Sequence, residues 1–276
     1  MKTVISILIV LVMVGILYFL MIMPALGQKA LQKELQKWYY AHRGLHDNGS
    51  DAPENSLAAF WKAVEQGFGM EMDVQLSKDR VPVVFHDSTL KRICGAEGKI
   101  SDYTYQELQQ FSLCGTKEKI PTLAQVLSLV GGRTPLIVEL KTETMDTTIC
   151  RLVDELLSDY PGLYCIESFN PWALFWYRVH KGEIVRGQLS DAFVRSGEFK
   201  GVSYWLLQNL LANWLSKPDF VAYNCKHPGI LSRRICHKVF RNTAVAWTVK
   251  SPQQMEKIRR DFDIFIFEGF IPSIRQ

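Results

Sequence analysis

Short apolar runs recur along the chain between residues 38 and 268, each about as long as one buried strand. Most of these runs are nearly continuous rather than alternating, which is typical of strands buried on both faces of a parallel sheet. Stretches with helical periodicity, such as residues 55–66, separate them, as parallel connections require. We predict nine strands, at Trp38–His42, Gly69–Gln75, Pro82–His86, Pro135–Leu140, Leu163–Phe169, Glu183–Gln188, Asp219–Asn224, Thr243–Val249 and Asp263–Glu268.

One connection is too short for a parallel crossover. Only residues 76–81 separate Gln75 from Pro82, so the strand Pro82–His86 must return antiparallel to Gly69–Gln75. The remaining eight strands then form eight strand–crossover units in about 240 residues, the usual size of this barrel. The sequence therefore predicts an α/β fold, a (β/α)8 TIM barrel with an antiparallel hairpin return after its second strand.

A long apolar run precedes the predicted barrel. Val4 to Leu26 is continuously apolar, and its length of roughly 34 Å as a helix is enough to cross the hydrocarbon core of a bilayer. A secretory signal has a shorter apolar core, of about 7–15 residues, so we favour a retained anchor although Ala25-Leu26-Gly27 resembles a cleavage site. We divide the chain into a transmembrane anchor at 1–27, a juxtamembrane helix at 28–37 and a barrel domain at 38–276.

Flanking charges and cysteine content favour the cytoplasmic side for the barrel. Lys29, Lys33 and Lys37 follow the apolar run, whereas Lys2 precedes it, and the more basic flank usually stays in the cytoplasm. The 6 cysteines include no Cys-x-x-Cys pair, and unpaired thiols suit a reducing compartment. The exported orientation stays open as the alternative. The net charge of +4 is too small to indicate a nucleic-acid partner, and the sequence indicates no protein partner.

Acids, imidazoles and cations gather at the carboxyl ends of the predicted strands, where barrels of this type carry their active sites. Glu71 and Asp73 are two residues apart on one strand and therefore point to the same face. A hairpin turn at Asp79-Arg80 would bring His86 opposite Asp73. We expect the same end to collect His42, Arg43, Asp87, Glu139, Lys141, Glu167, Arg186 and Trp247.

An ordered series of motifs covers most of the chain after the apolar run. It consists of His42-Arg43-Gly44, Pro53-Glu54-Asn55-Ser56, Glu71-x-Asp73-Val74, Asp79, Val83-Val84-Phe85-His86-Asp87, Ile120-Pro121-Thr122-Leu123, Glu139-Leu140-Lys141, Ser168-Phe169 and Trp247-Thr248-Val249. In content and order this series resembles the glycerophosphodiester phosphodiesterase family, whose fold is a (β/α)8 barrel. One stretch departs from the family pattern, because Glu268-Gly269 stands where a Thr-Asp or Thr-Asn usually precedes a proline.

The resemblance implies a divalent metal bound by carboxylates. Cleaving a phosphodiester anion requires a cation and basic side chains that neutralise developing charge. Glu71, Asp73 and Glu139 are hard ligands suited to Ca2+ or Mg2+. Arg43 and Lys141 are the candidates for binding the substrate phosphate.

His42 and His86 are the candidate proton-transfer pair, because imidazole titrates near neutral pH. The resemblance implies one base and one acid, with the glycerol 2-hydroxyl attacking phosphorus to give a cyclic phosphate that water then opens. We assign His42 as base and His86 as acid. Phe169 and Trp247 suit either a wall for the glycerol group or the barrel core. Residues 53–56 indicate a helix start capped by Asn55, with Glu54 supporting the metal shell.

The implied function is metal-dependent hydrolysis of glycerophosphodiesters to glycerol 3-phosphate and an alcohol. Two alternatives stay open: a lysophospholipase D that acts on membrane lysophospholipids with the same site, and a non-catalytic, membrane-tethered barrel that binds glycerophospho-groups. Ser168 has no neighbouring histidine and no Gly-x-Ser-x-Gly motif, which argues against a serine hydrolase. The sequence does not choose between Ca2+ and Mg2+ or between headgroups.

Overall fold

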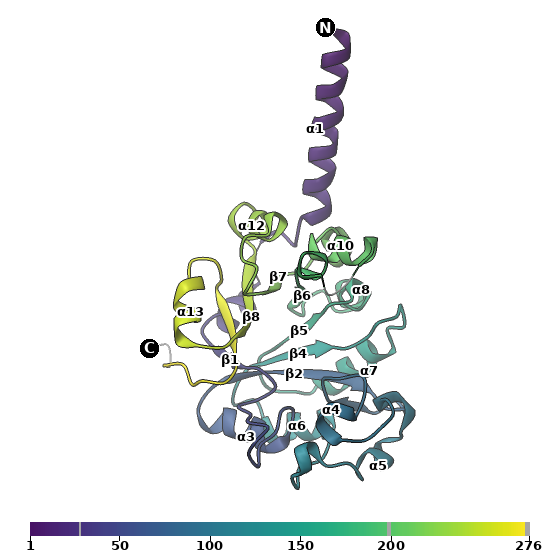
Figure 1. The fold of residues 1–276 in the computed structure, drawn as a ribbon, viewed down its shortest axis with the longest axis vertical. Helices are drawn as coiled ribbons and strands as arrows, with labels where there is room; N and C mark the ends of the chain where they lie inside the picture. Colours follow the sequence, from purple (N-terminus) through teal and green to yellow (C-terminus); the bar gives the residue numbers. More distant parts are fainter. Residues whose placement is uncertain (28, 198–199, 274–276) are drawn as a thin grey trace.

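A computed structural model describes residues 1–27, 29–197 and 200–273 of the chain. It shows a barrel surrounded by helices, with one long helix, α1 (Lys2–Ile22), projecting away from it (Figure 1). In the described part of the chain, α1 is the one helix long and apolar enough to cross a membrane, with a mean hydropathy of 3.0. The molecule therefore consists of an exposed apolar helix and a packed barrel.

Eight parallel strands close the barrel. β1 pairs with β2 on one side and with β9 on the other, and the strands β2, β4, β5, β6, β7, β8 and β9 pair in that order. This closure confirms the predicted (β/α)8 fold. The strands are β1 (Tyr39–Ala41), β2 (Gly69–Leu76), β4 (Leu136–Leu140), β5 (Tyr164–Ser168), β6 (Arg186–Ser190), β7 (Phe220–Asn224), β8 (Thr243–Val249) and β9 (Ile264–Phe267).

The predicted hairpin return is confirmed as β3 (Pro82–Val84), which pairs antiparallel with β2. The pairing places Val84 opposite Val74, and the amide of Phe85 donates to the carbonyl of Asp73 at 2.9 Å. The segment between β3 and β4 then forms a lobe with its own apolar core beside the barrel. Its helical elements are α4 (Lys91–Cys94), η1 (Ile100–Asp102), α5 (Tyr105–Leu108) and η2 (Leu113–Gly115). The next helix, α6 (Leu123–Val130), belongs instead to the layer that covers the barrel, because its buried residues join the main core.

The other helices cover the outside of the barrel (Figure 1). Their apolar faces pack on the outward side chains of the strands, while a second apolar cluster fills the barrel interior. They are α3 (Leu57–Glu65), α7 (Thr148–Leu157), α8 (Pro171–His180), α9 (Phe193–Ser196), α10 (Val202–Gln208), α11 (Asn213–Ser216), α12 (Leu231–Lys238) and α13 (Pro252–Ile258).

The short helix α2 (Ala30–Leu35) closes the amino end of the barrel. Leu35 is buried and packs into the interior cluster beside Tyr40. The Gln32 amide donates to the Asp219 carbonyl at 2.6 Å and to the Thr243 hydroxyl at 2.8 Å. The predicted juxtamembrane helix therefore packs against the floor of the barrel; Gln28, its predicted first residue, lies outside the described residues.

Two local predictions are wrong. β6 begins at Arg186, later than predicted, so this side chain lies at the amino end of the barrel, where its Nε donates to the Ser216 carbonyl at 3.0 Å. It therefore does not reach the mouth of the barrel, by which we mean the end where the carboxyl ends of the parallel strands meet. The N-cap of α3 is Ser56, whose hydroxyl accepts from the amide of Ala59, rather than Asn55. Asn55 instead adopts a left-handed conformation (φ 58°) and donates to Asp73 at 2.8 Å.

Candidate active site

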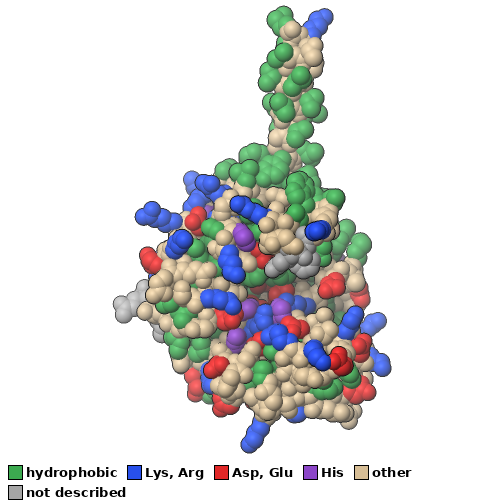
Figure 2. Space-filling model, viewed as in Figure 1, with side chains coloured by type: hydrophobic (Ala, Val, Ile, Leu, Met, Phe, Trp, Pro, Cys, Tyr) green, Lys and Arg blue, Asp and Glu red, His purple; other side chains and the backbone are tan. Residues whose placement is uncertain are grey.

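Charged side chains gather in a hollow at the carboxyl end of the barrel, at the centre of the face shown in Figure 2. Glu71 and Asp73 come from β2, and Glu139 comes from the neighbouring strand β4, where it lies in register with Asp73. All three are buried, and each offers an oxygen within 4.8 Å of the others. The structure thus brings together the three predicted metal ligands.

The three carboxylates are buried close together, so their negative charges repel one another. Burial and the charges of Asp73 and Glu139 raise the pKa of Glu71 well above its ordinary value. Burial also raises the pKa of Glu139 to about 7, although Lys141 opposes this effect. Lys141 partly balances the cluster, since its Nζ lies 2.9 Å from Asp73 Oδ1 and 2.9 Å from Glu139 Oε1. Such a donor set of hard oxygen ligands fits a divalent cation, whose charge would remove the repulsion.

His42 lies beside this cluster, directly after β1. Its Nδ1 is 2.8 Å from Glu268 Oε2, and its Nε2 is 3.9 Å from Glu71 Oε2. The hydrogen bond from His42 lowers the pKa of Glu268 to about 2, so this carboxylate is ionised and can only accept. Nδ1 therefore carries the hydrogen, and the neutral ring presents a free Nε2 lone pair. Burial, the largest influence, lowers the pKa of His42 and favours this neutral form.

A carboxylate also orients His86, in the same way as Glu268 orients His42. Its Nδ1 lies 2.6 Å from Asp87 Oδ1, and Arg92 binds both oxygens of Asp87, at 2.7 and 2.8 Å. The carboxylate of Asp87 is thereby held as an acceptor, which leaves Nε2 of His86 for a ligand. Burial lowers the pKa of His86, and the negative charge of Asp73 opposes this effect. Each histidine is thus oriented by its own carboxylate.

Arg43 adopts a left-handed conformation (φ 55°) that turns its backbone amide toward Glu71 Oε2, at 3.1 Å. Its guanidinium donates to Glu54 at 2.6 Å, and its Nε lies 3.3 Å from Asp73 Oδ2. Glu54 also accepts two bonds from Arg92, at 2.7 and 2.8 Å. Glu54 is therefore outside the group of three clustered carboxylates and instead joins Arg43 to the β3–β4 lobe.

Replacing Glu54 by glutamine is expected to destabilise the fold at neutral pH. Burial opposes ionisation of Glu54, but the bonds from Arg92 and the charge of Arg43 outweigh it and hold its pKa well below its ordinary value. The folded state therefore gains stability from the charged form above about pH 4, and loses this contribution as the pH falls. We expect E54Q to cost about 2–4 kcal/mol at pH 7, because two guanidinium groups each lose one of their two charged partners inside a buried network.

Denaturant unfolding in detergent, followed by tryptophan fluorescence, measures this cost. The gap between wild type and E54Q should narrow as the pH is lowered below about 4. E65Q, at the exposed end of α3, is the matched control and should unfold like wild type. An E54Q protein as stable as wild type at pH 7 would contradict the prediction.

Aromatic side chains form one wall of the mouth. Phe169 follows β5 and meets Trp247 of β8 edge to face, with ring centroids 5.7 Å apart. Phe169 also packs against Phe193 of α9 at 5.8 Å. The Trp247 indole N–H is buried and has no hydrogen-bond partner among the described residues. A wall with an unused donor suits a ligand with hydroxyl groups.

The barrel sequence matches that of a known protein family. The family model described as "Glycerophosphoryl diester phosphodiesterase family" matches residues 42–261. The chain belongs to this family. Its members are phosphodiesterases, so the chain is an enzyme of that class, as the resemblance predicted.

Curated relatives and solved structures agree with this membership. A glycerophosphodiester phosphodiesterase of Caldanaerobacter subterraneus is 40% identical over 148 residues, which are 49% of this chain and 58% of the relative. YhdW of Bacillus subtilis is 38% identical over 229 residues, 79% of this chain and 88% of the relative. A glycerophosphodiester phosphodiesterase of Thermotoga maritima has a TM-score of 0.64 at 26% identity, covering 83% of this chain and 93% of its own.

A phosphodiesterase of Oleispira antarctica, solved in complex with the product sn-glycerol-3-phosphate, has a TM-score of 0.69 at 24% identity. The likeness covers 86% of this chain and 94% of that one. At this identity it supports the barrel fold.

Within this family site, sequence reasoning missed Glu268 and Arg92. Glu268 stands in the stretch that departs from the family pattern, and its position after the last strand was the available signal for a mouth residue. Arg92 lies on α4 in the lobe between β3 and β4, rather than directly at a strand end. No spacing rule connects it to Asp87 and Glu54.

Proposed function

We propose that this family member hydrolyses glycerophosphodiesters to glycerol 3-phosphate and an alcohol, with a divalent metal held by Glu71, Asp73 and Glu139. The observation that carries the proposal is the buried cluster of these three carboxylates. When bound there, a divalent cation would polarise the phosphoryl oxygens of the substrate. The product in the Oleispira antarctica complex, sn-glycerol-3-phosphate, supports the proposed product.

His42 and His86 are assigned the proton transfers. His42 presents a neutral Nε2, because its Nδ1–H is engaged by Glu268, and this atom accepts the proton of the glycerol 2-hydroxyl. His86 supplies a proton to the oxygen of the departing alcohol, and Asp87 stabilises its charged form. In the second half of the reaction, water opens the cyclic phosphate with the two roles reversed.

Arg43 and Lys141 are assigned to the substrate phosphate. Both lie beside Asp73, Arg43 at 3.3 Å and Lys141 at 2.9 Å, so a phosphate at the metal site would meet two positive charges. Their carboxylate partners hold them in place before substrate binds. Phe169 and Trp247 are assigned to the glycerol group, with the unused indole N–H as a donor to a hydroxyl.

Purified full-length protein in detergent should release glycerol 3-phosphate from glycerophosphocholine when Ca2+ or Mg2+ is supplied. A chelator should stop the release, and added metal should restore it. Folded protein that turns over no glycerophosphodiester and no lysophospholipid would overturn the proposal. In that case binding of glycerophosphocholine without turnover would favour the non-catalytic barrel. A metal-bound structure identifies the ion, because Ca2+ lies about 2.3–2.6 Å from its oxygen ligands and Mg2+ about 2.0–2.1 Å.

A lysophospholipase D is the second candidate, because α1 is long and apolar enough to hold the barrel at a bilayer. Such an enzyme uses the same catalytic groups on a lipid that stays in the membrane. Rates on glycerophosphocholine and on lysophosphatidylcholine in vesicles separate the two candidates. The soluble diester should be the better substrate if the first proposal holds.

We infer that α1 is a retained membrane span rather than a cleaved signal. Ile22 is fully buried against the barrel, and its carbonyl accepts from Asn213 at 2.9 Å and from the Cys236 thiol at 3.3 Å. Lys217 also donates to the carbonyl of Met23 at 3.0 Å. Cleavage at Ala25-Leu26-Gly27 would remove these contacts. We therefore assign the anchor to 1–27, the juxtamembrane helix to 28–37 and the barrel domain to 38–276.

We also propose that the barrel lies on the cytoplasmic side. All 6 cysteines, which lie in the described part of the chain, are free thiols, as suits a reducing compartment. In a bacterial host, protease added to spheroplasts should leave the barrel intact, and permeabilised spheroplasts are the control. Labelling of the half-buried Cys94 and Cys114 by an impermeant thiol reagent should likewise require permeabilisation. Degradation or labelling in intact spheroplasts would place the barrel outside the cell.

A further inference from the structure

The last turn of α1 is bound tightly to one wall of the barrel. Its contacts are with α11 and α12, through the buried Ile22 and the side chains of Asn213 and Cys236. In addition, the Ala25 amide donates to the Pro218 carbonyl at 3.0 Å. These buried contacts fix the direction of α1 relative to the barrel, so a bilayer around α1 would meet the same wall each time.

This wall exposes large apolar side chains around the base of α1. Figure 1 places α10 and α12 on either side of the helix, and Figure 2 shows apolar side chains there. The surfaces of soluble proteins rarely expose so many large apolar side chains in one place. The exposed fractions are 74% for Val202, 50% for Trp205, 53% for Trp214, 63% for Leu231 and 60% for Val239.

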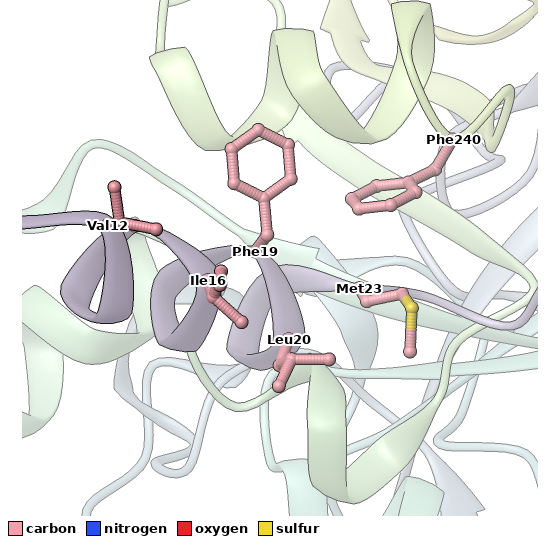
Figure 3. A pocket seen from close by; sticks show the side chains of 7 residues that line it. Val12, Ile16, Phe19, Leu20, Met23 and Phe240 are labelled. Carbon is pink, nitrogen blue, oxygen red and sulfur yellow. The ribbon is translucent and has the colours of Figure 1, made fainter. Parts of the chain in front are cut away.

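The apolar surface is continuous with the membrane span. A groove of about 480 Å³ lies between α1 and Phe240, just after α12, and its lining is almost entirely apolar (Figure 3). Phe19 of α1 and Phe240 meet edge to face, with ring centroids 6.1 Å apart. Because the same surface runs from α1 onto the barrel, the lipid that surrounds α1 also reaches this wall.

The charge of the wall complements an anionic lipid surface. Residues 201–241 contain one acidic residue, Asp219, which is buried and paired with Lys29 at 2.9 Å. The same segment carries a formal charge of +5, whereas the whole chain carries +4. Basic and aromatic residues together are typical of surfaces that lie at the membrane interface. The exposed basic residues are Lys226, Arg234, Lys238 and Arg241, and Lys217 is half-buried. Arg233 is buried and donates to the carbonyls of Pro228 and Asp261, so it does not contribute to this surface.

We propose that the wall formed by α10, α11 and α12 lies on the bilayer that α1 spans, with anionic phospholipid headgroups as its partner. Trp205, Trp214 and Leu231 enter the interface, and Arg234 and Lys238 meet the headgroups. The inference rests on α1 as a membrane span and goes beyond the proposed catalytic activity.

This arrangement has a consequence for the active-site mouth. Phe193 of α9 packs against Phe169 at the mouth and against Tyr204 of α10, with ring centroids 5.8 and 5.7 Å apart. A row of aromatic rings therefore connects the mouth to the membrane-facing wall. Docking of the wall places that edge of the mouth at the level of the headgroups.

The test uses full-length protein in vesicles of phosphatidylcholine and phosphatidylglycerol, with a spin label near the top of the acyl chains of some lipids. The label should quench tryptophan fluorescence. The W205F/W214F double variant should lose about half or more of that quenching, because its interfacial tryptophans are absent. W61F is the matched control and should keep it, because Trp61 is also exposed (42%) but lies on α3, at the opposite end of the molecule (Figure 1). Vesicles without phosphatidylglycerol should give weaker quenching.

Three measurements on the same samples separate the possible failures. Flotation after an alkaline wash reports whether α1 is integrated, and protein that is washed off would overturn both the span and the docked wall. If the protein is integrated but W205F/W214F is quenched as strongly as wild type, the docked wall alone is overturned. A dimer in detergent that covers these two tryptophans would overturn it as well. Release of glycerol 3-phosphate from glycerophosphocholine tests the catalytic proposal independently, since neither tryptophan belongs to the mouth.

Discussion

Replacing His42 or His86 by alanine is expected to lower kcat by about 10²–10⁴-fold, the usual contribution of general acid–base catalysis. Each ring presents its Nε2 to the mouth because a carboxylate engages its Nδ1, at 2.8 Å for His42 and 2.6 Å for His86. Metal affinity should stay close to wild type, since neither ring belongs to the cluster of three carboxylates. Steady-state kinetics on glycerophosphocholine and calorimetric metal titration measure the two effects.

H180A is the matched control for these variants. His180 is exposed at the end of α8 and stacks on Trp176, with ring centroids 4.7 Å apart, away from the strand ends that form the mouth. Its removal should leave kcat unchanged. An H42A or H86A protein with wild-type kcat would show that the corresponding proton is transferred by another group.

The role of Glu268 as a positioning residue can be tested in the same assay. E268Q replaces the charged acceptor of the His42 Nδ1–H by a neutral one. A hydrogen bond to a charged group is worth about 1.5–3 kcal/mol, so kcat should fall by about 10–100-fold with KM nearly unchanged. E268D should recover less activity than wild type but more than E268Q. If E268Q lowers thermal stability as well as kcat and also raises KM, Glu268 has a structural role instead.

Replacing Glu71 or Glu139 by glutamine is expected to abolish most metal binding and activity while leaving the metal-free protein at least as stable as wild type. Burial and neighbouring negative charges raise the pKa of both groups, so their ionised forms cost folding energy at neutral pH. Removing one charge relieves that cost. Metal at about 100 times its Kd should stabilise wild type by about 2.7 kcal/mol and should stabilise E71Q and E139Q far less.

Thermal melts with and without Ca2+ or Mg2+ provide this readout without reference to activity. E65Q is the control, because Glu65 lies at the exposed end of α3 and should not affect the metal-induced shift. D73N is less informative, since Asp73 also accepts a hydrogen bond from Asn55 and forms an ion pair with Lys141. Unchanged metal-induced shifts in both E71Q and E139Q would refute the carboxylate assignment.

The sequence alone was enough to predict the barrel and its hairpin, because both follow from local rules. Buried strands leave nearly continuous apolar runs, and the six residues between Gln75 and Pro82 are too few for a crossover. The clustering of Glu71, Asp73 and Glu139 was predictable for the same reason. Side chains two apart on a strand share a face, and the carboxyl ends of parallel strands share one mouth.

Only the tertiary structure decided which partner each charged group takes. Arg186 follows an apolar pair, Ile184-Val185, and was predicted at the mouth, but the register of β6 places it at the opposite end, near Ser216. Glu268 contacts His42 from the end of β9, the strand that pairs with β1, and Arg92 joins the nearby Asp87 to Glu54, 38 residues earlier in the chain. Such contacts depend on the relative placement of elements far apart in the chain, which closure of the barrel sets and no local pattern records. The sequence by itself therefore determined the strands and the clustering of the three carboxylates, and the folded barrel determined how the histidines are oriented and which wall α1 packs against.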